Sequence, residues 1–202
     1  MKKLLSALFF VLFVQLIHAE NDNQSRMAVD EYIDWLTSVI TLSDQQVAEI
    51  RELRRDYVNA VSGIAENNFQ LRNEKQIQFW EKRNKQLDRE SLITLGIIQI
   101  TEYELGKVKE MLGFDDAQVA DLKEKLNSYN KVLMGAKYIY DTNSQDFKDV
   151  EQMVYQRTYD AIEEICSESQ KQRCGDMKGA ILTKINNYID GYIHYNTNST
   201  IN

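Results

Sequence analysis

The most constraining feature of this 202-residue chain is that it contains no proline. At the usual frequency of about 5%, about ten prolines would be expected. Because proline removes a backbone donor and breaks helix interiors, its absence favours long uninterrupted helices and argues against proline-rich linkers and polyproline ligands. A hydrophobic content of 43% excludes a wholly disordered chain. We therefore expect an all-α fold with enough residues for a buried core.

Apolar residues recur every three or four positions over most of the chain, which predicts amphipathic helices. Gly113 is a natural helix stop, and the segment 142–144 is a predicted turn. We predict a helical bundle of about five to six helices. The stretch 92–100 is apolar on all sides and rich in β-branched residues, so a buried strand is the alternative there. The clearest apolar stripe consists of Val47, Ile50, Leu53, Tyr57, Val61 and Ile64.

The N-terminus has the layout of a secretory signal peptide. Lys2 and Lys3 precede an apolar run over 4–17, and Ala19 supplies a small residue at the cleavage point. The run is shorter than the roughly 20 residues that span a bilayer, although an uncleaved anchor is the alternative. We predict a signal peptide over 1–19, export to the periplasm or the medium, and no integral membrane span after cleavage.

Cleavage also changes the charge of the chain. Removing residues 1–19 takes away two lysines and no acids, which leaves 22 basic against 31 acidic residues and a net charge of −9. A negative chain is repelled by phosphate backbones, so we expect no nucleic-acid partner.

Cys166 and Cys174 are the only cysteines. In an oxidising compartment we expect them to form a disulfide that closes the loop 167–173 and staples a C-terminal helical hairpin. A loop of that length corresponds to about 2.5 kcal/mol of stabilisation. A redox-active thiol pair is the alternative, but such pairs normally have the tighter C-x-x-C spacing. The last helix follows the loop, and residues 196–202 are predicted to be a disordered tail.

The most specific feature is an internal repeat with an offset of 72 residues. Residues 40–64 align with residues 112–136 with seven identities. The first copy begins with the capping-box pair Ser43 and Gln46, and the same pattern recurs 72 residues later. Two interpretations stay open, a true repeat or two amphipathic helices that share a cap for ordinary physical reasons.

These residues resemble the L-T-x-x-Q motif of the Spy/CpxP periplasmic proteins. The segment Leu42-Ser43-Asp44-Gln45-Gln46 resembles one copy, and Phe114-Asp115-Asp116-Ala117-Gln118 resembles a more divergent second copy. The family consists of small exported helical proteins that carry two such motifs and act as ATP-independent chaperones or stress-signalling adaptors, usually as cradle-shaped dimers. The resemblance implies that the motif and candidate partner-binding residues are Leu42, Ser43, Gln46, Phe114, Asp115 and Gln118.

The sequence carries no catalytic signature. The only histidine after cleavage is His194, and no cluster of histidine, cysteine and carboxylate side chains has metal-ligand spacing. There is no glycine-rich phosphate loop and no serine-nucleophile motif. Carboxylate pairs such as Glu163 and Glu164 are adjacent, so they point in different directions on a helix. We predict a protein that is not an enzyme and that needs no cofactor and no metal.

Two aromatic groups are candidate contact surfaces. Phe79 and Trp80 lie in a charged stretch, and we treat them as candidate partner-binding residues because aromatic side chains anchor interfaces well. The second group is a set of tyrosines concentrated in the C-terminal half, for which packing between the last two helices is the alternative. Its members are Tyr138, Tyr140, Tyr155, Tyr159, Tyr188, Tyr192 and Tyr195.

These observations predict a single helical domain over 20–195 that binds a protein partner or an unfolded client. A broad apolar helical face could also produce a homodimer. The functional hypothesis is a Spy/CpxP-like chaperone or stress adaptor. The alternative is a secreted effector, or an immunity or inhibitor protein, that binds one specific partner.

Overall fold

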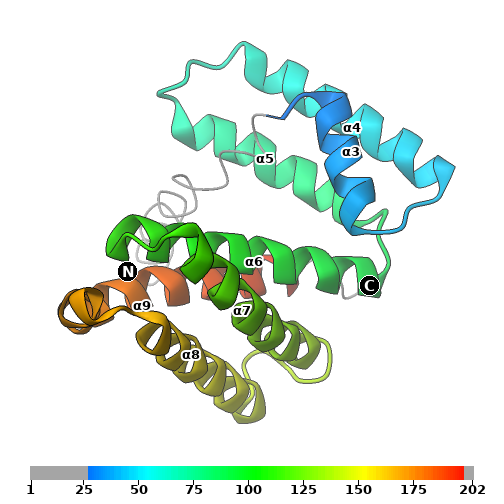
Figure 1. Ribbon diagram of the computed structural model, residues 1–202. Helices are drawn as coiled ribbons and strands as arrows, with labels where there is room; N and C mark the ends of the chain where they lie inside the picture. Colours follow the sequence, from blue (N-terminus) through cyan, green and yellow to red (C-terminus); the bar gives the residue numbers. More distant parts are fainter. Residues whose placement is uncertain (1–26, 198–202) are drawn as a thin grey trace, which may run out of the picture. The chain divides into compact units, whose positions relative to one another are not determined.

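The computed structural model describes residues 27–197 (Figure 1). The predicted signal peptide over 1–19 lies outside the described residues. Within 27–197 the chain forms seven helices and no strands, so the all-α prediction is confirmed and the predicted number of helices was too low. The helices are α3 (Val29–Val39), α4 (Asp44–Ser62), α5 (Phe69–Asn84), α6 (Arg89–Leu112), α7 (Asp116–Lys137), α8 (Gln145–Ile165) and α9 (Glu168–Thr197).

The chain groups into two compact units, which we describe separately. Unit 1 extends to Leu92 and contains α3, α4 and α5, whereas unit 2 begins at Ile93 and contains most of α6 and all of α7, α8 and α9. The boundary falls in the first turn of α6. The single domain over 20–195 stays a prediction.

In unit 1, α4 packs against both α3 and α5. The buried apolar side chains of unit 1 include Leu36 of α3 and Ile50 of α4. The rings of Tyr32, Tyr57 and Phe79 meet between the three helices. The apolar stripe of the sequence therefore faces the core at Ile50, Tyr57 and Val61.

In unit 2, α8 packs against α7 and α9, and buried side chains of all four helices form one apolar core. Fully buried members come from α6 (Val108), α7 (Leu126), α8 (Ile162) and α9 (Ile185, Ile189). The stretch 92–100, for which a strand was the alternative, lies within α6. None of its residues is exposed: Leu95, Gly96, Gln99 and Ile100 are buried and the others are half-buried, which explains why this helical stretch is apolar almost all round.

Three helix boundaries differ from the prediction. Helix α7 ends at Lys137, ahead of the predicted turn over 142–144. Helix α8 begins at Gln145 because Ser144 caps it by accepting a hydrogen bond from the Phe147 N–H at 3.2 Å. Helix α9 begins at Glu168, so residues 168–173 are helical where a loop was expected. It continues to Thr197, which places residues 196 and 197 in a helix and leaves only 198–202 of the predicted tail outside the described residues.

The early start of α9 has a local cause. The Gln170 side-chain oxygen accepts hydrogen bonds from the Ser167 N–H and the Ser167 hydroxyl, both at 2.9 Å. This is the backbone-to-side-chain half of a capping box, and it begins a helix two residues after α8 ends. The serine-x-x-glutamine spacing that marks the start of α4 is also present at 167–170, where a loop and not a helix start was predicted.

Candidate functional site

The first motif forms a complete capping box at the start of α4. The Ser43 hydroxyl accepts from the Gln46 N–H at 3.2 Å, and the Gln46 side-chain oxygen accepts from the Ser43 N–H at 2.9 Å. The Gln46 amide nitrogen then donates to the carbonyl oxygen of Gln86 at 2.6 Å. Gln86 follows the end of α5, so one side chain joins the start of one helix to the end of another. Leu42, before the cap, is half-buried.

The second motif is built in the same way at the start of α7. The Asp115 carboxylate accepts from the Gln118 N–H at 2.9 Å, and the Gln118 side-chain oxygen accepts from the Asp115 N–H at 3.1 Å. The Gln118 amide nitrogen donates to the carbonyl oxygen of Ile165, the last residue of α8, at 2.9 Å. Phe114, before the cap, is buried.

The two motifs therefore share a third hydrogen bond that a capping box does not require. In each unit the glutamine amide reaches the carbonyl at the end of the helix that follows the capped one. Shared capping alone does not account for this second match. Burial extends the correspondence backward, because positions 72 residues apart in α3 and α6 are buried in both units. These pairs are Ile33 with Leu105, Leu36 with Val108 and Ile40 with Leu112.

The motif of unit 2 joins two more helix ends, the start of α9 and the end of α6. The Gln118 amide nitrogen also donates to the Gln170 side-chain oxygen at 2.8 Å. The Gln170 amide in turn donates to the carbonyl oxygens of Leu112 at 3.4 Å and Gly113 at 3.3 Å. Gly113 has a left-handed φ of 69°, which confirms the predicted glycine stop after α6. The Gln118–Gln170 pair thus joins the ends of α6 and α8 to the starts of α7 and α9.

The predicted aromatic pair divides between core and surface. Phe79 is only 3% exposed and contacts the Tyr32 and Tyr57 rings at centroid distances of 5.4 Å each. Trp80 is half-buried on the next position of α5. Phe79 is therefore a core residue of unit 1, and only Trp80 of the two has surface available for a partner.

A buried cation that sequence reasoning missed lies among these rings. The Arg54 guanidinium carbon lies over the ring centroids of Tyr32 at 4.5 Å, Tyr57 at 5.0 Å and Phe79 at 5.5 Å. Burial lowers the pKa of Arg54, and the nearby Arg83 lowers it further, while Tyr32 and Tyr57 act in the opposite direction. The signal was its spacing, because Arg54 falls on the apolar stripe between Ile50 and Tyr57.

The second buried arginine of unit 1 is held by neutral groups. Arg83 donates to the Tyr32 hydroxyl oxygen at 3.1 Å and to the Asn84 side-chain oxygen at 2.7 Å. Arg54 likewise donates to the carbonyl oxygen of Met27 at 2.5 Å. The core of unit 1 thus holds two arginines that contact aromatic faces and neutral oxygens, and the nearby Glu31 acts against the lowering of the Arg54 pKa.

The core of unit 2 holds an acid instead. Glu104 of α6 is fully buried, and its carboxyl accepts a hydrogen bond from the Asn130 side-chain amide of α7 at 2.6 Å. The same amide donates to the Thr101 hydroxyl at 3.0 Å. Burial raises the pKa of Glu104 to about 8, while the polar groups of Asn130 and Thr158 lower it to a smaller extent.

The Glu104 cluster leaves polar atoms unpaired. The second Glu104 oxygen, the Asn130 side-chain oxygen and the Thr158 hydroxyl have no partner in hydrogen-bond geometry within the described part of the chain. Thr158 of α8 is close enough to influence the carboxyl but is not aligned with it. A carboxyl that keeps its proton can donate to a nearby oxygen, so the neutral acid fits this site better than the carboxylate.

A second cluster of acids lies between α8 and α9. The Tyr155 hydroxyl donates to the Asp190 carboxylate at 2.7 Å. Burial and the negative charge of Asp190 raise the pKa of Glu151 to about 7. Burial and the same two carboxyl groups also raise the pKa of Tyr155. The cluster can therefore take up one proton near neutral pH.

Most of the predicted tyrosine surface is packed inside unit 2. Tyr188 is buried and stacks on Tyr103 of α6, with ring centroids 3.8 Å apart and planes 5° apart. Tyr159 is also buried, and the Lys178 amine lies 3.7 Å from its ring centroid. Tyr155 and Tyr192 are half-buried, whereas Tyr140 is exposed. Packing therefore accounts for the described side chains of this group better than a partner-binding face, with Tyr140 the exception. The Tyr195 side chain lies outside the described ones.

Lys137, the last residue of α7, is buried without a hydrogen-bond partner for its amine among the described residues. The amine lies 5.9 Å from the Tyr138 ring centroid and 5.8 Å from that of Tyr192. Burial lowers the pKa of Lys137 to about 8. The two aromatic faces offset part of the cost of burying its charge.

The two cysteines meet but are not bonded. Cys166 caps the end of α8 and Cys174 lies in the second turn of α9, where both are buried as free thiols 3.6 Å apart. The structure therefore lacks the predicted disulfide, and the segment between the two cysteines is mostly helix, not loop. Burial and the neighbouring Cys174 raise the pKa of Cys166 to about 12, which makes its thiol a poor nucleophile.

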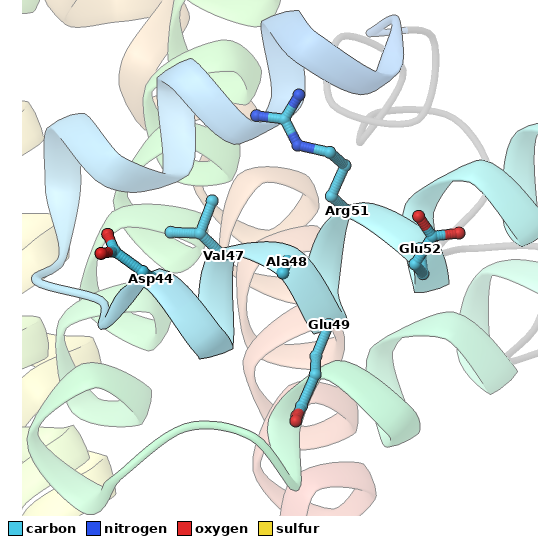
Figure 2. A pocket seen from close by; sticks show the side chains of 6 residues that line it. All are labelled: Asp44, Val47, Ala48, Glu49, Arg51 and Glu52. Carbon is cyan, nitrogen blue, oxygen red and sulfur yellow. The ribbon is translucent and has the colours of Figure 1, made fainter.

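An open hollow of about 380 Å³ lies on the solvent side of α4 (Figure 2). Its six lining residues come from the first three turns of that helix, directly after the first motif. They are Asp44, Val47, Ala48, Glu49, Arg51 and Glu52.

The described residues contain neither a metal-binding cluster nor a membrane-spanning helix. Between residues 27 and 197, no group of three or more histidine, cysteine, aspartate or glutamate side chains is arranged to hold a metal ion. None of the helices in that range combines the length and apolar character needed to cross a bilayer.

Comparison of the chain with protein-family models, with curated proteins and with solved structures gives no match.

Proposed function

We propose that this protein is a non-enzymatic, exported helical protein that binds other proteins, as a chaperone or stress adaptor of the Spy/CpxP kind. The observation that carries the proposal is the pair of matching motif boxes. Gln46 and Gln118 occupy the same position in two repeated helical units and make the same three hydrogen bonds. A duplicated motif of this kind is what the resemblance implies.

Exposed apolar side chains at one end of α7 supply a contact surface for a client. Val132 is 43% exposed, Ile139 is 70% exposed and Tyr140 is 40% exposed. All three lie in the last two turns of α7 or in the turn that follows it. Because most of the Ile139 side chain is in contact with water, burying it against a partly folded protein is favourable.

The proposal is tested by aggregation of unrelated denatured proteins. We expect the purified protein to suppress light scattering by several clients at near-stoichiometric ratios. The variant Ile139→Asp should suppress less, because it places a charge in the contact surface. Leu71→Asp, at an exposed apolar position of unit 1, is the matched control, because it also replaces an exposed apolar side chain by a charge. Loss of protection across all clients in the wild type would remove the chaperone role.

The dedicated-partner alternative has its own readout. An effector, immunity protein or inhibitor would retain one partner at equal molar ratio in a pull-down from the periplasm or from target cells. A chaperone would retain many proteins in substoichiometric amounts.

We also propose export and oxidation of the cysteine pair. Export is tested by fractionation, in which the mature chain should begin at Glu20. In an oxidising compartment, an external disulfide would take up two electrons and two protons as the thiols of Cys166 and Cys174 form one bond. An S–S bond is about 2.05 Å long, so the sulfurs need to approach by a small rotation of their side chains. The intact mass of the exported protein should be two hydrogens lower than that of its reduced form.

A further inference from the structure

The face of α4 that lines the open hollow is repeated on α7. Each of the six hollow-lining residues has a counterpart 72 positions later of the same type or the same charge. Four pairs are identical, and the other two replace glutamate by aspartate and arginine by lysine. The counterparts are Asp116, Val119, Ala120, Asp121, Lys123 and Glu124.

Four of the six pairs also match in exposure, whereas Glu49 and Arg51 are half-buried and their counterparts Asp121 and Lys123 are exposed. Ala48 and Ala120 are both exposed, as are Glu52 and Glu124, while Val47 and Val119 are both half-buried. We call the two sets of six residues the α4 face and the α7 face. Each face has a valine and an alanine at its centre, with carboxylates around them.

Packing and capping do not explain the match. Acidic residues in the first turn favour the helix dipole, but this effect falls off after that turn, and Ala48 and Glu52 lie beyond it. Core packing does not constrain Ala48, Glu52 or their two counterparts, because all four side chains are exposed. The buried positions of the two helices are partly kept, as in Ile50 with Leu122 and Val61 with Leu133, and partly changed, as in Arg54 with Leu126.

We propose that the α4 face and the α7 face are two equivalent docking surfaces for a cationic helical segment of a partner protein. The inference rests on the proposed function and names the chemistry of its partner.

Charge decides the occupant. The α4 face has three carboxylates against one guanidinium, and the α7 face has three carboxylates against one amine, so each has a net charge of −2. In unit 1 the Arg51 guanidinium pairs with Asp30 of α3, which directs it away from the face. Cations outside the two sets pair with one carboxylate of each face, Arg55 with Glu52 and Lys109 with Asp116, so two carboxylates of each face have no salt bridge among the described residues. A second copy of this chain would bring carboxylates against carboxylates. A lysine- or arginine-rich helix with small apolar residues between its charges matches both the rim and the centre.

The test uses a fluorescein-labelled alanine–lysine peptide of about 20 residues, long enough to hold a helix, and its alanine–glutamate counterpart. We expect the wild-type protein to bind two equivalents of the lysine peptide, with affinity that falls as salt rises, and to bind none of the glutamate peptide. Ala48→Arg and Ala120→Arg should each remove one equivalent. The double variant should bind at least about tenfold more weakly, because an added cation repels the peptide.

The matched control is the double variant Ala60→Arg with Ala180→Arg. Both alanines are exposed on helices of the same two units, and the change in net charge is the same. It should keep both equivalents. Equal weakening by the control pair would show attraction to overall negative charge only, and would overturn the proposal. Binding that survives Ala48→Arg with Ala120→Arg, with circular dichroism unchanged, would overturn it as well.

The outcome is separable from that of the proposed function. If the wild-type protein suppresses client aggregation and neither suppression nor peptide binding depends on positions 48 and 120, the docking surfaces are wrong and the proposed function stands. If the wild-type protein protects no client but binds two peptides at these positions, the reverse holds.

Discussion

The two units build one helical pattern around different ionisable groups, a cation in unit 1 and an acid that keeps its proton in unit 2. In unit 1 the Arg54 guanidinium lies among three aromatic rings, whereas in unit 2 the Glu104 carboxyl lies against Asn130. Glu104 occupies the position that corresponds to Tyr32, one of the rings around Arg54. The comparison teaches that the repeated pattern fixes which helix faces are buried, while the chemistry at the centre is free to change. It also predicts different responses of the two units to mutation and to pH.

The largest expected effect comes from removing the cation of unit 1. Arg54→Ala should lower the free energy of unfolding by about 4 kcal/mol, because it empties a fully buried volume and removes the contacts with Tyr32, Tyr57 and Phe79. Arg54→Leu, which places the unit 2 residue in unit 1, should cost less, since it refills part of the volume without a buried charge. Urea unfolding measures both. Equal losses would show that the charge, and not the volume, is what unit 1 needs.

The next effect is a pH dependence that belongs to unit 2. Burial raises the pKa of Glu104 to about 8 in the folded state, from an ordinary value of 4.5. Between these two pH values the folded state holds a proton on Glu104 that the unfolded state has lost. The contribution of Glu104 to the free energy of unfolding is therefore greatest at acidic pH and falls as pH rises. One group contributes about 1.4 kcal/mol per pH unit, or about 3 kcal/mol between pH 5 and pH 7.

The variant Glu104→Gln isolates that contribution. Glutamine keeps the shape and hydrogen-bonding capacity of the protonated acid but does not titrate, so the fall in stability between pH 5 and pH 7 should be smaller than in the wild type. Glu151 also has a raised pKa, of about 7, and contributes in the same direction. Glu151→Gln is therefore the matched variant. The dependence of stability on pH that remains in one variant reports the contribution of the other glutamate. An unchanged slope in Glu104→Gln would mean that the buried carboxyl is ionised.

A third prediction separates the units by redox state. Oxidation of Cys166 and Cys174 should stabilise unit 2 by about 2.5 kcal/mol through loop closure. Reductant should lower the melting temperature of the wild type and leave that of Cys166→Ser with Cys174→Ser unchanged. The transition of unit 1, which contains no cysteine, should not move. A stability independent of reductant would assign the thiols to packing alone.

The smallest effects test the equivalence of the two motifs. Gln46→Ala and Gln118→Ala each remove a capping-box bond and a bond to the end of a neighbouring helix, and each should cost about 1–2 kcal/mol. Gln118→Ala should cost more, because it also separates Gln170 from its partner. Gln45→Ala, which removes only an exposed bond to Glu49 in the same turn region, is the control. Hydrogen exchange of α4 and α7 would assign each loss to its unit.

Sequence patterns located the capped helix starts well, because a cap is a local interaction between residues three apart. Ser43 with Gln46 and Asp115 with Gln118 behave as predicted. The same rule would have located α9 at Ser167, but the cysteines on either side suggested a closed loop instead. The predicted bond between them is absent from the structure.

The polar centres could not be located in this way, because they depend on contacts between residues far apart in the chain. Glu104 and Asn130 are 26 positions apart, and nothing in the local pattern distinguishes Glu104 from an exposed glutamate. Phe79 failed as a surface candidate for the same reason. The exposed Glu81 and Lys82 lie on other sides of α5, whereas Phe79 and the charged Arg83 one turn later are both buried, and Phe79 faces Tyr32 and Tyr57.

The Gln118–Gln170 pair sets an order of completion for a chain that emerges from its N-terminus. The Gln46 side chain finds its last partner at Gln86, so unit 1 has all of these bonds once the first half of the chain is available. The Gln118 amide waits for Ile165 and Gln170, near the start of the final helix. A protein threaded through an export channel would therefore close unit 1 while unit 2 is still in transit, and unit 2 would close only when nearly the whole chain has crossed.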